Sequence, residues 1–200
     1  MRSRKETEEK LLNAAGRVLA RDGFNKLGVN AVAREAGVDK VLIYRYFDGL
    51  DGLIKAYARQ GDFWPSLDEI MGEPIEQFRN RKLADQMKTI MTNIAEGIRK
   101  RPLTIEILAW EMVERNELTA YLEDIRERGG LKLTEVLNID SEEPAVSIDI
   151  AALIAIAVAS INYLAARSRK ISVFNGIEIR EDEGWKRLTG TMATIFDKCL

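Results

Sequence analysis

Basic and aromatic side chains are concentrated in one short segment, Tyr44–Phe47, and Lys40 lies one helical turn before it. Lysine, arginine and tyrosine side chains bind the phosphates and base edges of DNA. The apolar side chains of Val41 and Leu42 offer a different contact, with the methyl group of thymine. The chemistry that these residue types predict is therefore nucleic-acid binding.

A helix, a tight turn and a second helix would position this segment. In the first helix, Val32, Ala33 and Ala36 share one face. Gly37 follows, where a left-handed residue ends a helix at little steric cost. Asp39 can then accept hydrogen bonds from the first free amides of the second helix. This order is typical of a helix–turn–helix that enters a DNA major groove, although helical hairpins in other all-α proteins also contain such a glycine.

The second helix is expected from Lys40 to Tyr46. Residues at i, i+1 and i+4 share a face, so Ile43, Tyr44 and Phe47 are expected to lie together. Upstream, Arg2, Arg4 and Lys5 form either a flexible basic arm that contacts DNA or a solvated start of the chain. The DNA-binding residues expected from the two helices are Asn30, Lys40, Val41, Leu42, Tyr44, Arg45 and Tyr46.

Amphipathic helices flank this pair. One is expected over Glu6–Ala20, ending before Gly23 and the apolar anchor Phe24. Asp48-Gly49 is a turn signal, and a further helix is expected from Leu50 to about Phe63. The apolar residues of the two helices are Leu11, Ala14, Ala15, Val18, Leu19, Leu53, Ile54 and Tyr57.

Residues Lys10 to Tyr57 resemble the N-terminal DNA-binding domain of TetR-family transcriptional regulators. The resemblance implies a three-helix head with a helix–turn–helix and an all-helical domain for ligand binding and dimerisation. It also implies two-fold dimers on palindromic operators, usually repressors that a small molecule releases. The matching residues, in the family's order and spacing, are Leu12, Ala14, Ala15, Leu19, Gly23, Phe24, Val32, Ala33, Ala36, Gly37, Val38, Ile43, Tyr44, Tyr46, Phe47 and Leu53.

The chain departs from the family pattern at a few DNA-facing positions. Val29 stands where the family often has serine or threonine, so Asn30 is expected to take over that contact. Val41 and Leu42 stand where glycine and threonine are frequent, which makes the expected base contacts more apolar. Leu50 stands where lysine is common, which removes one phosphate contact.

Charge is distributed unevenly along the chain. Through Phe47 the sequence has ten basic and six acidic residues, whereas the rest has 20 basic and 26 acidic residues. The head is therefore basic and the body acidic, although the net charge is −2. A basic head on an acidic body is expected of a DNA-binding protein whose body stays away from the phosphates.

Composition argues against catalysis. The sequence has no histidine, no cysteine cluster, no glycine-rich phosphate loop and no HExxH motif. Carboxylates alternate with lysine and arginine at the spacing of a solvated helix surface. We therefore expect no enzymatic activity, no metal and no cofactor.

The charged N-terminus does not resemble a signal peptide, and the single cysteine, Cys199, fits a reducing cytoplasm, where we expect the protein.

The remaining chain is predicted to be helical, without a strand of any length. Helices are expected over Lys82–Lys100, Leu103–Arg115, Glu117–Leu137 and Glu183–Lys198. The third is weakened at Gly129-Gly130, and Pro102 is expected in the first turn of the second. Residues 65–80 read as a connector, and Ser141–Pro144 is a turn and helix-start signal. The expected inward residues are Met87, Ile90, Met91, Ile94, Ile98, Leu188, Met192, Ile195 and Phe196.

One segment, Ile150–Ala166, has no charge. It is shorter than the roughly 20 residues of a transmembrane helix. A buried helix is therefore expected, and because it is apolar on both sides it must pack on both sides. Its small-residue side allows the same helix of a second subunit to approach, which with Glu183–Lys198 predicts a four-helix dimer interface. That side consists of Ala152, Ala155, Ala159, Tyr163 and Ala166.

Methionine and aromatic residues of the body are candidates for the wall of a small-molecule pocket, although each is also typical of an ordinary core. Trp110-Glu111 would favour a cationic ligand if Glu111 faced the pocket rather than the surface. The candidate ligand-binding residues are Trp64, Met87, Met91, Trp110, Met112, Asn162 and Tyr163.

The sequence as a whole predicts an all-α protein with two domains. Residues 1–49 form the helix–turn–helix DNA-binding head, and residues 50–200 form a helical ligand-binding and dimerisation domain. The expected function is a sequence-specific transcriptional regulator, a homodimeric repressor released from a palindromic operator by a small molecule, with no membrane partner. Two alternatives remain: a DNA-binding activator or architectural protein without a ligand, and a helical protein-interaction module that lacks DNA binding.

Overall fold

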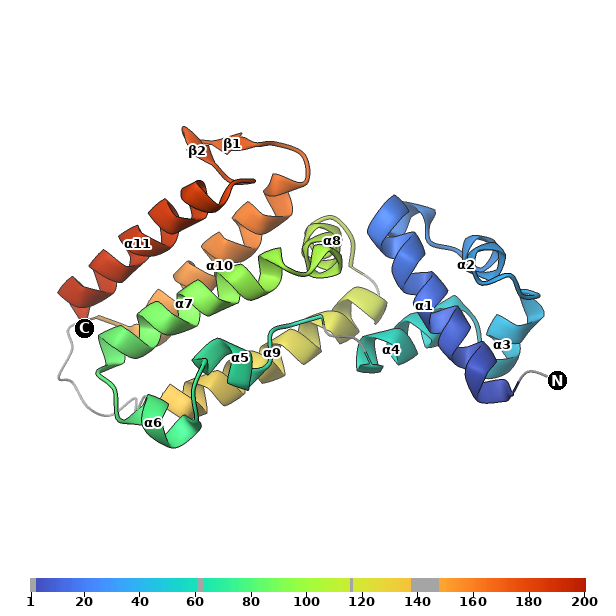
Figure 1. The fold of residues 1–200 in the computed structure, drawn as a ribbon, viewed down its shortest axis with the longest axis horizontal. Coiled ribbons are helices and arrows are strands. Elements are labelled where there is room, and N and C mark those ends of the chain that lie inside the picture. The colour runs from blue at the N-terminus through green and yellow to red at the C-terminus, as the bar shows by residue number, and fades with distance from the viewer. Residues whose placement is uncertain (1–2, 61–62, 116, 138–147) are drawn as a thin grey trace. The chain divides into compact units, whose positions relative to one another are not determined.

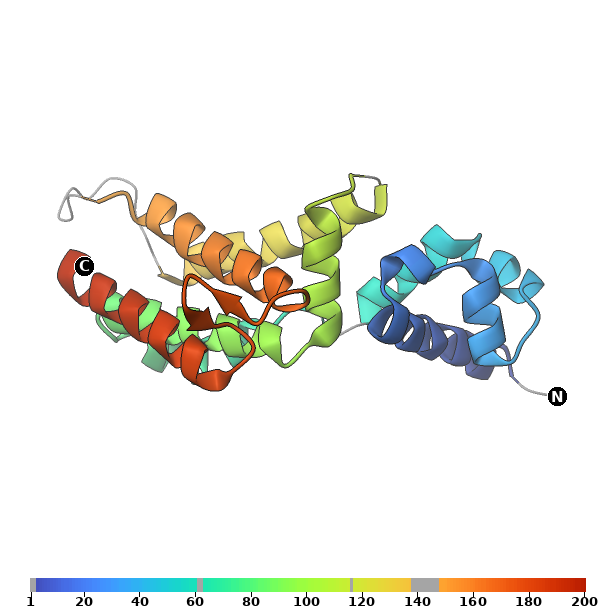
Figure 2. The same ribbon diagram turned by 90° about the horizontal axis from the view of Figure 1, so that it is seen from above.

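The computed structural model describes residues 3–60, 63–115, 117–137 and 148–200 (Figures 1 and 2). These residues are almost entirely helical, as expected. They form two compact units: Met1–Phe63 with Pro102–Asp124, and Trp64–Arg101 with Ile125–Leu200. The first unit thus extends past the boundary expected at residue 49. The turn and helix-start signal at Ser141–Pro144 lies outside the described residues.

The first unit holds the expected helix–turn–helix, in blue and cyan in Figure 1. Its N-terminal helix starts at Arg4, with Ser3 and Glu6 in a reciprocal capping box. The flexible basic arm is therefore wrong for Arg4 and Lys5, which are helical, while Arg2 lies outside the described residues. The elements are α1 (Arg4–Asp22), the 3₁₀ helix η1 (Phe24–Lys26), α2 (Val29–Ala36), α3 (Val41–Phe47), α4 (Leu50–Gln60), α8 (Pro102–Glu111) and the start of α9 (Glu117–Leu137).

The core of the first unit is built on the apolar face of α1. Leu11, Val18 and the other residues expected on that face are fully or almost fully buried, and α2 and α4 pack against them. Ile43 of α3 and Leu53 of α4 are also completely buried. This core fixes the orientation of α3, because Ile43 cannot leave it without exposing its side chain to water.

A surface charge cluster joins α1 to α2. Arg17 Nε and Arg21 Nη1 donate to the two carboxylate oxygens of Glu35, at 2.8 and 2.9 Å. These hydrogen bonds from Arg17 and Arg21 lower the pKa of Glu35. The cluster is therefore intact at neutral pH and is lost only as the pH falls through that lowered pKa. Since the groups are exposed, the cluster helps to orient α2 more than it stabilises the fold.

The second unit is organised around α7 (Leu83–Arg99), which packs against α5, α10 and α11. Its apolar face, including Met87 and Ile90, is buried as expected. The connector expected over residues 65–80 contains two short helices. The elements of this unit are α5 (Leu67–Met71), α6 (Ile75–Arg79), α7, the remainder of α9, α10 (Ile150–Ser168), β1 (Val173–Phe174), β2 (Ile177–Glu178) and α11 (Asp182–Cys199).

A small β-hairpin was not expected from the sequence. Phe174 of β1 pairs with Ile177 of β2 in antiparallel register. The turn residues Asn175 and Gly176 both have positive φ, 48° and 75°. Asn-Gly is the pair that favours such two-residue turns, so this signal was present in the sequence. The strands are only two residues long, too short for an alternating pattern to reveal them.

Helix α10 is far less buried than its sequence predicts. Only 28% of its most apolar 18-residue window is buried, and Ile156 is 69% exposed. Of its small-residue side, Ala159 is exposed and Ala166 is buried. Among the described residues α10 is also the one helix with the length and hydropathy of a membrane span, a property shared by core helices of soluble proteins. The part of the chain that the structure describes therefore leaves an apolar face of α10 uncovered.

Candidate DNA interface and ligand cavity

The turn between α2 and α3 has the expected left-handed glycine, whereas the N-cap of α3 is Lys40 rather than Asp39. Gly37 adopts the left-handed conformation, with φ of 65° and ψ of 38°, and its amide closes α2. Asp39 Oδ1 accepts a hydrogen bond from the backbone N–H of Val41 at 2.8 Å. The carboxylate thus satisfies a free amide at the start of α3, which begins one residue later than expected and ends at Phe47.

The outer face of α3 carries both polar and apolar side chains. Lys40 and Arg45 are exposed, and Val41 is 60% exposed. Tyr44 is 58% exposed, so its expected place beside Ile43 is wrong and its ring lies on the outer face. The short helix α3 packs only a narrow face against the core, and Ile43 is the residue of α3 that is completely buried. The neighbouring Tyr44 therefore lies outside that face.

The other expected DNA-binding residues differ in their exposure. Asn30 is exposed in the first turn of α2, whereas Leu42 and Tyr46 are half-buried. The Arg4 guanidinium lies 5.2 Å from the centre of the Tyr46 ring. Tyr46 therefore holds a basic residue of α1 close to α3, a contact that the sequence did not predict.

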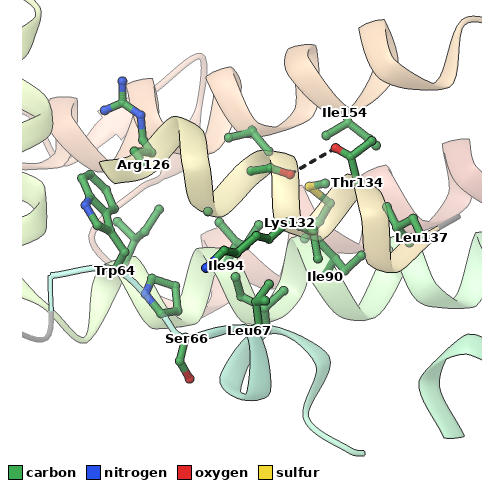
Figure 3. A pocket seen from close by; sticks show the side chains of 18 of the residues that line it. Trp64, Ser66, Leu67, Ile90, Ile94, Arg126, Lys132, Thr134, Leu137 and Ile154 are labelled. Atoms are coloured by element: carbon green, nitrogen blue, oxygen red, sulfur yellow. Dashed lines mark hydrogen bonds between the residues drawn. The ribbon is translucent and has the colours of Figure 1, made fainter. Parts of the chain in front are cut away.

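A cavity of about 420 Å³ lies within the second unit (Figure 3). Its volume falls within the range of small-molecule sites. Residues spaced three or four apart line it from α7, α9 and α10, so each helix contributes one face. The lining consists of Trp64, Pro65, Ser66, Leu67, Ile70, Met87, Ile90, Met91, Ile94, Ile98, Ile125, Arg126, Gly129, Gly130, Lys132, Leu133, Thr134, Leu137, Ile154, Val158 and Asn162.

The segment Trp64–Ser66 is fixed to the end of α7. Ser66 and Glu69 form a capping box at the start of α5, and Arg101 Nη2 donates to both carboxylate oxygens of Glu69, at 2.8 and 3.0 Å. The hydrogen bond from Arg101 lowers the pKa of Glu69. Gly97 allows Pro65 to approach, since a Cβ there would lie 2.8 Å from Pro65 Cβ. The cavity wall at Trp64 is therefore rigidly supported at neutral pH.

The structure brings four of the expected ligand-binding residues together. Trp64, Met87, Met91 and Asn162 all line the cavity. Sequence reasoning missed the contribution of the second half of α9, including Arg126 and Lys132. The available signal was the pair Gly129-Gly130, which sequence reasoning treated only as a weak point of a helix.

The remaining three expected residues lie elsewhere. Trp110 stacks on Phe24 with ring centres 3.9 Å apart, and its Nε1 donates to Glu114 at 2.9 Å. Met112 is 51% exposed, and Tyr163 is 43% exposed on α10 with its edge against Phe174. Trp110 thus serves the first unit, where it packs α8 against η1.

A second hollow of about 490 Å³ lies between α7 and α11 and has a different character. Arg99 within it donates to Asp182 at 2.6 Å and covers the Trp185 ring at 5.4 Å. Its main cation is thus already paired by the protein. Among the described residues there is no group of three or more metal-binding side chains. The apolar cavity is therefore the better candidate for a ligand site.

Comparison with known proteins agrees with this geometry. Residues 11–57 match the family model of bacterial regulatory proteins of the tetR family. No curated protein matches the chain significantly. The matched segment contains α2, α3 and most of α1 and α4, which is the helix–turn–helix with its supporting core.

Similar solved structures cover the whole chain. The fatty acid degradation regulator FadR from Bacillus halodurans has 14% identity and a TM-score of 0.61 over 95% of this chain and 94% of its own. FadR from Bacillus subtilis, solved with stearoyl-CoA, has 16% identity and a TM-score of 0.61 over 96% and 98%. A TetR-family regulator from Haemophilus influenzae has 17% identity and a TM-score of 0.55 over 97% and 98%. Residues 11–57 thus match the DNA-binding segment of the tetR family, and the chain as a whole has the fold of these solved regulators.

Proposed function

We propose that the protein is a homodimeric transcriptional repressor that binds a palindromic operator in the cytoplasm and is released by a small molecule. The observation that carries the proposal is the outer face of α3, where Val41, Tyr44 and Arg45 are exposed while Ile43 anchors the helix. A short helix held in this way presents side chains to the DNA major groove.

The residues of α3 and α2 have distinct roles in this proposal. Lys40 and Asn30 contact phosphates and set the position of the head on the duplex. Arg45 and Tyr44 contact base edges, and Val41 contacts a thymine methyl group. Because Leu42 and Tyr46 are half-buried, they contribute less to base contact and more to the placement of the helix.

Dimerisation in this proposal uses the exposed face of α10. Ile156, Ala159 and Tyr163 lie on it, and a row of apolar side chains on one helix is typical of a protein interface. Two copies of α10 related by a two-fold axis would bury the same residues on both sides. The dimer places two α3 helices on half-sites one helical turn of DNA apart.

Ligand release in this proposal follows from the way the cavity is built. Its walls come from α7 and α9, and α9 starts in the first unit and ends in the second. Helix α8 follows α7 directly and carries Trp110, which stacks on Phe24 of the head unit. A ligand that changes the positions of α7 and α9 would shift the population of head arrangements away from the one that fits the operator.

Replacing Arg45 by alanine is expected to weaken operator binding by roughly 10- to 100-fold, the cost of one bidentate base contact. The measurement is binding to a DNA fragment from upstream of the protein's own gene, at several salt concentrations. Arg45→Lys keeps the charge but not the planar fork, so it is expected to keep nonspecific affinity and lose selectivity. Lys170→Ala, an exposed cation of the second unit, is the control and should bind as the wild type does.

Weak binding that is equal for all sequences and for all these variants would contradict the proposal. The protein would then be better described as a helical interaction module. Tight operator binding that no small molecule weakens would instead favour a regulator without a ligand.

A further inference from the structure

The face of α10 that lines the cavity carries a polar side chain, Asn162. Ile154, Val158 and Asn162 follow one another at four-residue spacing, and all three line the cavity. The exposed residues Ile156 and Tyr163 lie on a different face of the helix. Asn162 therefore belongs to the cavity wall and not to the uncovered face of α10.

The Asn162 carboxamide is half-buried, and it makes no hydrogen bond with the residues that the structure describes. Its amide nitrogen offers two donors, and its amide oxygen is an acceptor. Ile161 and Leu164 beside it in the helix are buried. Since a polar group in such apolar surroundings is normally hydrogen-bonded, Asn162 marks a point where a ligand can supply both an acceptor and a donor.

Asn162 lies toward the end of the cavity where Trp64 and Arg126 are found. Ile154 lies at the opposite end, near Leu137, where α9 ends (Figure 3). Both Ile154 and Asn162 line the cavity, and Asn162 is about two turns farther along α10, or about 12 Å along the helix axis. The cavity therefore has hydrocarbon side chains at one end and a carboxamide toward the other.

The charged residues of the lining do not require a charged ligand. The Arg126 guanidinium lies 5.5 Å from the centre of the Trp64 ring, and Arg126 has a further interaction within the protein. Lys132 is exposed, so its ammonium can stay in water while its aliphatic stem lines the cavity. The described lining contains no aspartate or glutamate, so a cation finds no opposite charge there.

The uncharged polar groups of the lining, apart from Asn162, are bonded within the protein or buried behind its surface. The Ser66 hydroxyl accepts from the backbone N–H that it caps, at 3.2 Å, and the Thr134 hydroxyl donates to the backbone carbonyl one turn earlier, at 3.1 Å. Trp64 Nε1 is buried, so a ligand contacts the indole ring and not its N–H. Within the described lining, the Asn162 carboxamide is therefore the uncharged side-chain group that a ligand can bond.

We infer that the cavity binds an uncharged, largely apolar molecule whose polar group both donates and accepts a hydrogen bond, an amide or an alcohol, and that this group bonds Asn162. An ion would lose its hydration among side chains that are mostly aliphatic or methionine, which is costly without a buried counter-ion. An amide or hydroxyl exchanges its hydrogen bonds with water for hydrogen bonds with the carboxamide. The inference rests on the proposed function only for its regulatory meaning.

The test is calorimetric titration of the full chain, without DNA, at a pH at which decanoate is ionised. The 420 Å³ cavity has room for about 14 groups the size of a water molecule, so reagents with a ten-carbon chain fit. Decanamide and 1-decanol donate and accept, 2-decanone only accepts, and decanoate and decylammonium are ions. We expect decanamide or 1-decanol to bind roughly tenfold or more tightly than both ions and roughly threefold or more tightly than 2-decanone. The tighter of the two identifies an amide or an alcohol as the ligand.

Asn162→Leu keeps the size of the side chain and removes its donors and acceptor. It is expected to weaken decanamide binding roughly tenfold and to abolish the preference over 2-decanone. Ser160→Ala, on the same helix but outside the lining, is the matched control, and Lys132→Gln should also leave decanamide binding unchanged. Tightest binding of decanoate, a preference for decanamide that survives Asn162→Leu, or no binding of any reagent would overturn the inference.

The ligand class and the proposed function fail in different ways. Operator binding is measured separately, without any of these reagents, so an absent ligand leaves the DNA-binding function untouched. An amide or alcohol that binds in calorimetry but does not release the operator would confirm the ligand class and refute the release step.

A second variant changes the preferred ligand instead of removing it. Asn162→Asp has the same shape as the wild type but places a carboxylate in the cavity wall. It is expected to raise the affinity for decylammonium roughly tenfold, because the ammonium then forms a charge-assisted hydrogen bond, and to lower the affinity for decanamide. The same calorimetric titration measures both changes, and thermal unfolding confirms that the variant is folded. A folded Asn162→Asp variant with the wild-type order of affinities would show that Asn162 does not contact the ligand, and it would overturn the inference.

Discussion

Ala159→Glu is expected to convert the proposed homodimer to a monomer and to lower operator affinity by roughly 10²- to 10⁴-fold, the contribution of a second tethered binding module. Ala159 is exposed on α10, between Ile156 and Tyr163. In a dimer through this face the new carboxylates would be buried near the two-fold axis without a partner, which costs several kcal/mol per charge. The measurements are equilibrium sedimentation and operator binding.

A control variant tests whether the position of the added charge causes the effect, rather than the added charge alone. Ser172→Glu adds the same charge at an exposed residue just beyond α10, whose backbone carbonyl still accepts from the Ile179 amide whatever the side chain. It should remain dimeric and bind the operator normally. A dimer that survives Ala159→Glu would show that the subunits meet elsewhere, for instance through the second hollow beside α11.

The head could be predicted almost completely, because its signals are local. Leu11, Val18 and Leu19 are spaced for one helical face and all are buried. The turn from Gly37 to Asp39 uses residues whose conformational preferences decide the geometry without help from distant contacts. The placement of Tyr44 was wrong because the spacing of residues along a helix predicts a buried face poorly when the helix has only two turns. In α3 the neighbouring helices decide which side is covered.

The cavity could be predicted only in part, because it depends on packing between distant segments. The periodicity of α7 marks Met87 and Met91 as inward, but it cannot tell whether a neighbouring side chain fills the space beyond them. Trp110 looked equivalent to Trp64 in sequence, yet one packs on Phe24 and the other lines the cavity. The exposure of α10 has a similar cause. The apolar residues on both sides of this helix predict that both sides pack against something, but they do not identify the segment or subunit that packs there.

The close approach of α4 to the end of α3 depends on Gly52, a role that the sequence does not predict. It lies in the first turn of α4, where a Cβ would come within 1.6 Å of the Phe47 carbonyl oxygen at the end of α3. That distance is close to a covalent bond, and the atom it meets is backbone that cannot rotate away. The turn between the two helices is itself constrained, with φ of 59° at Asp48 and 106° at Gly49.

Gly52→Ala is therefore expected to destabilise the first unit by about 3 kcal/mol or more and to abolish operator binding, because α3 and α4 can no longer pack together. Gly28→Ala is the matched control: its φ of −163° is extended backbone, and a Cβ there meets no atom within 4 Å. Thermal unfolding and operator binding measure the effect. Normal operator binding by Gly52→Ala would refute the close packing on which that interface depends.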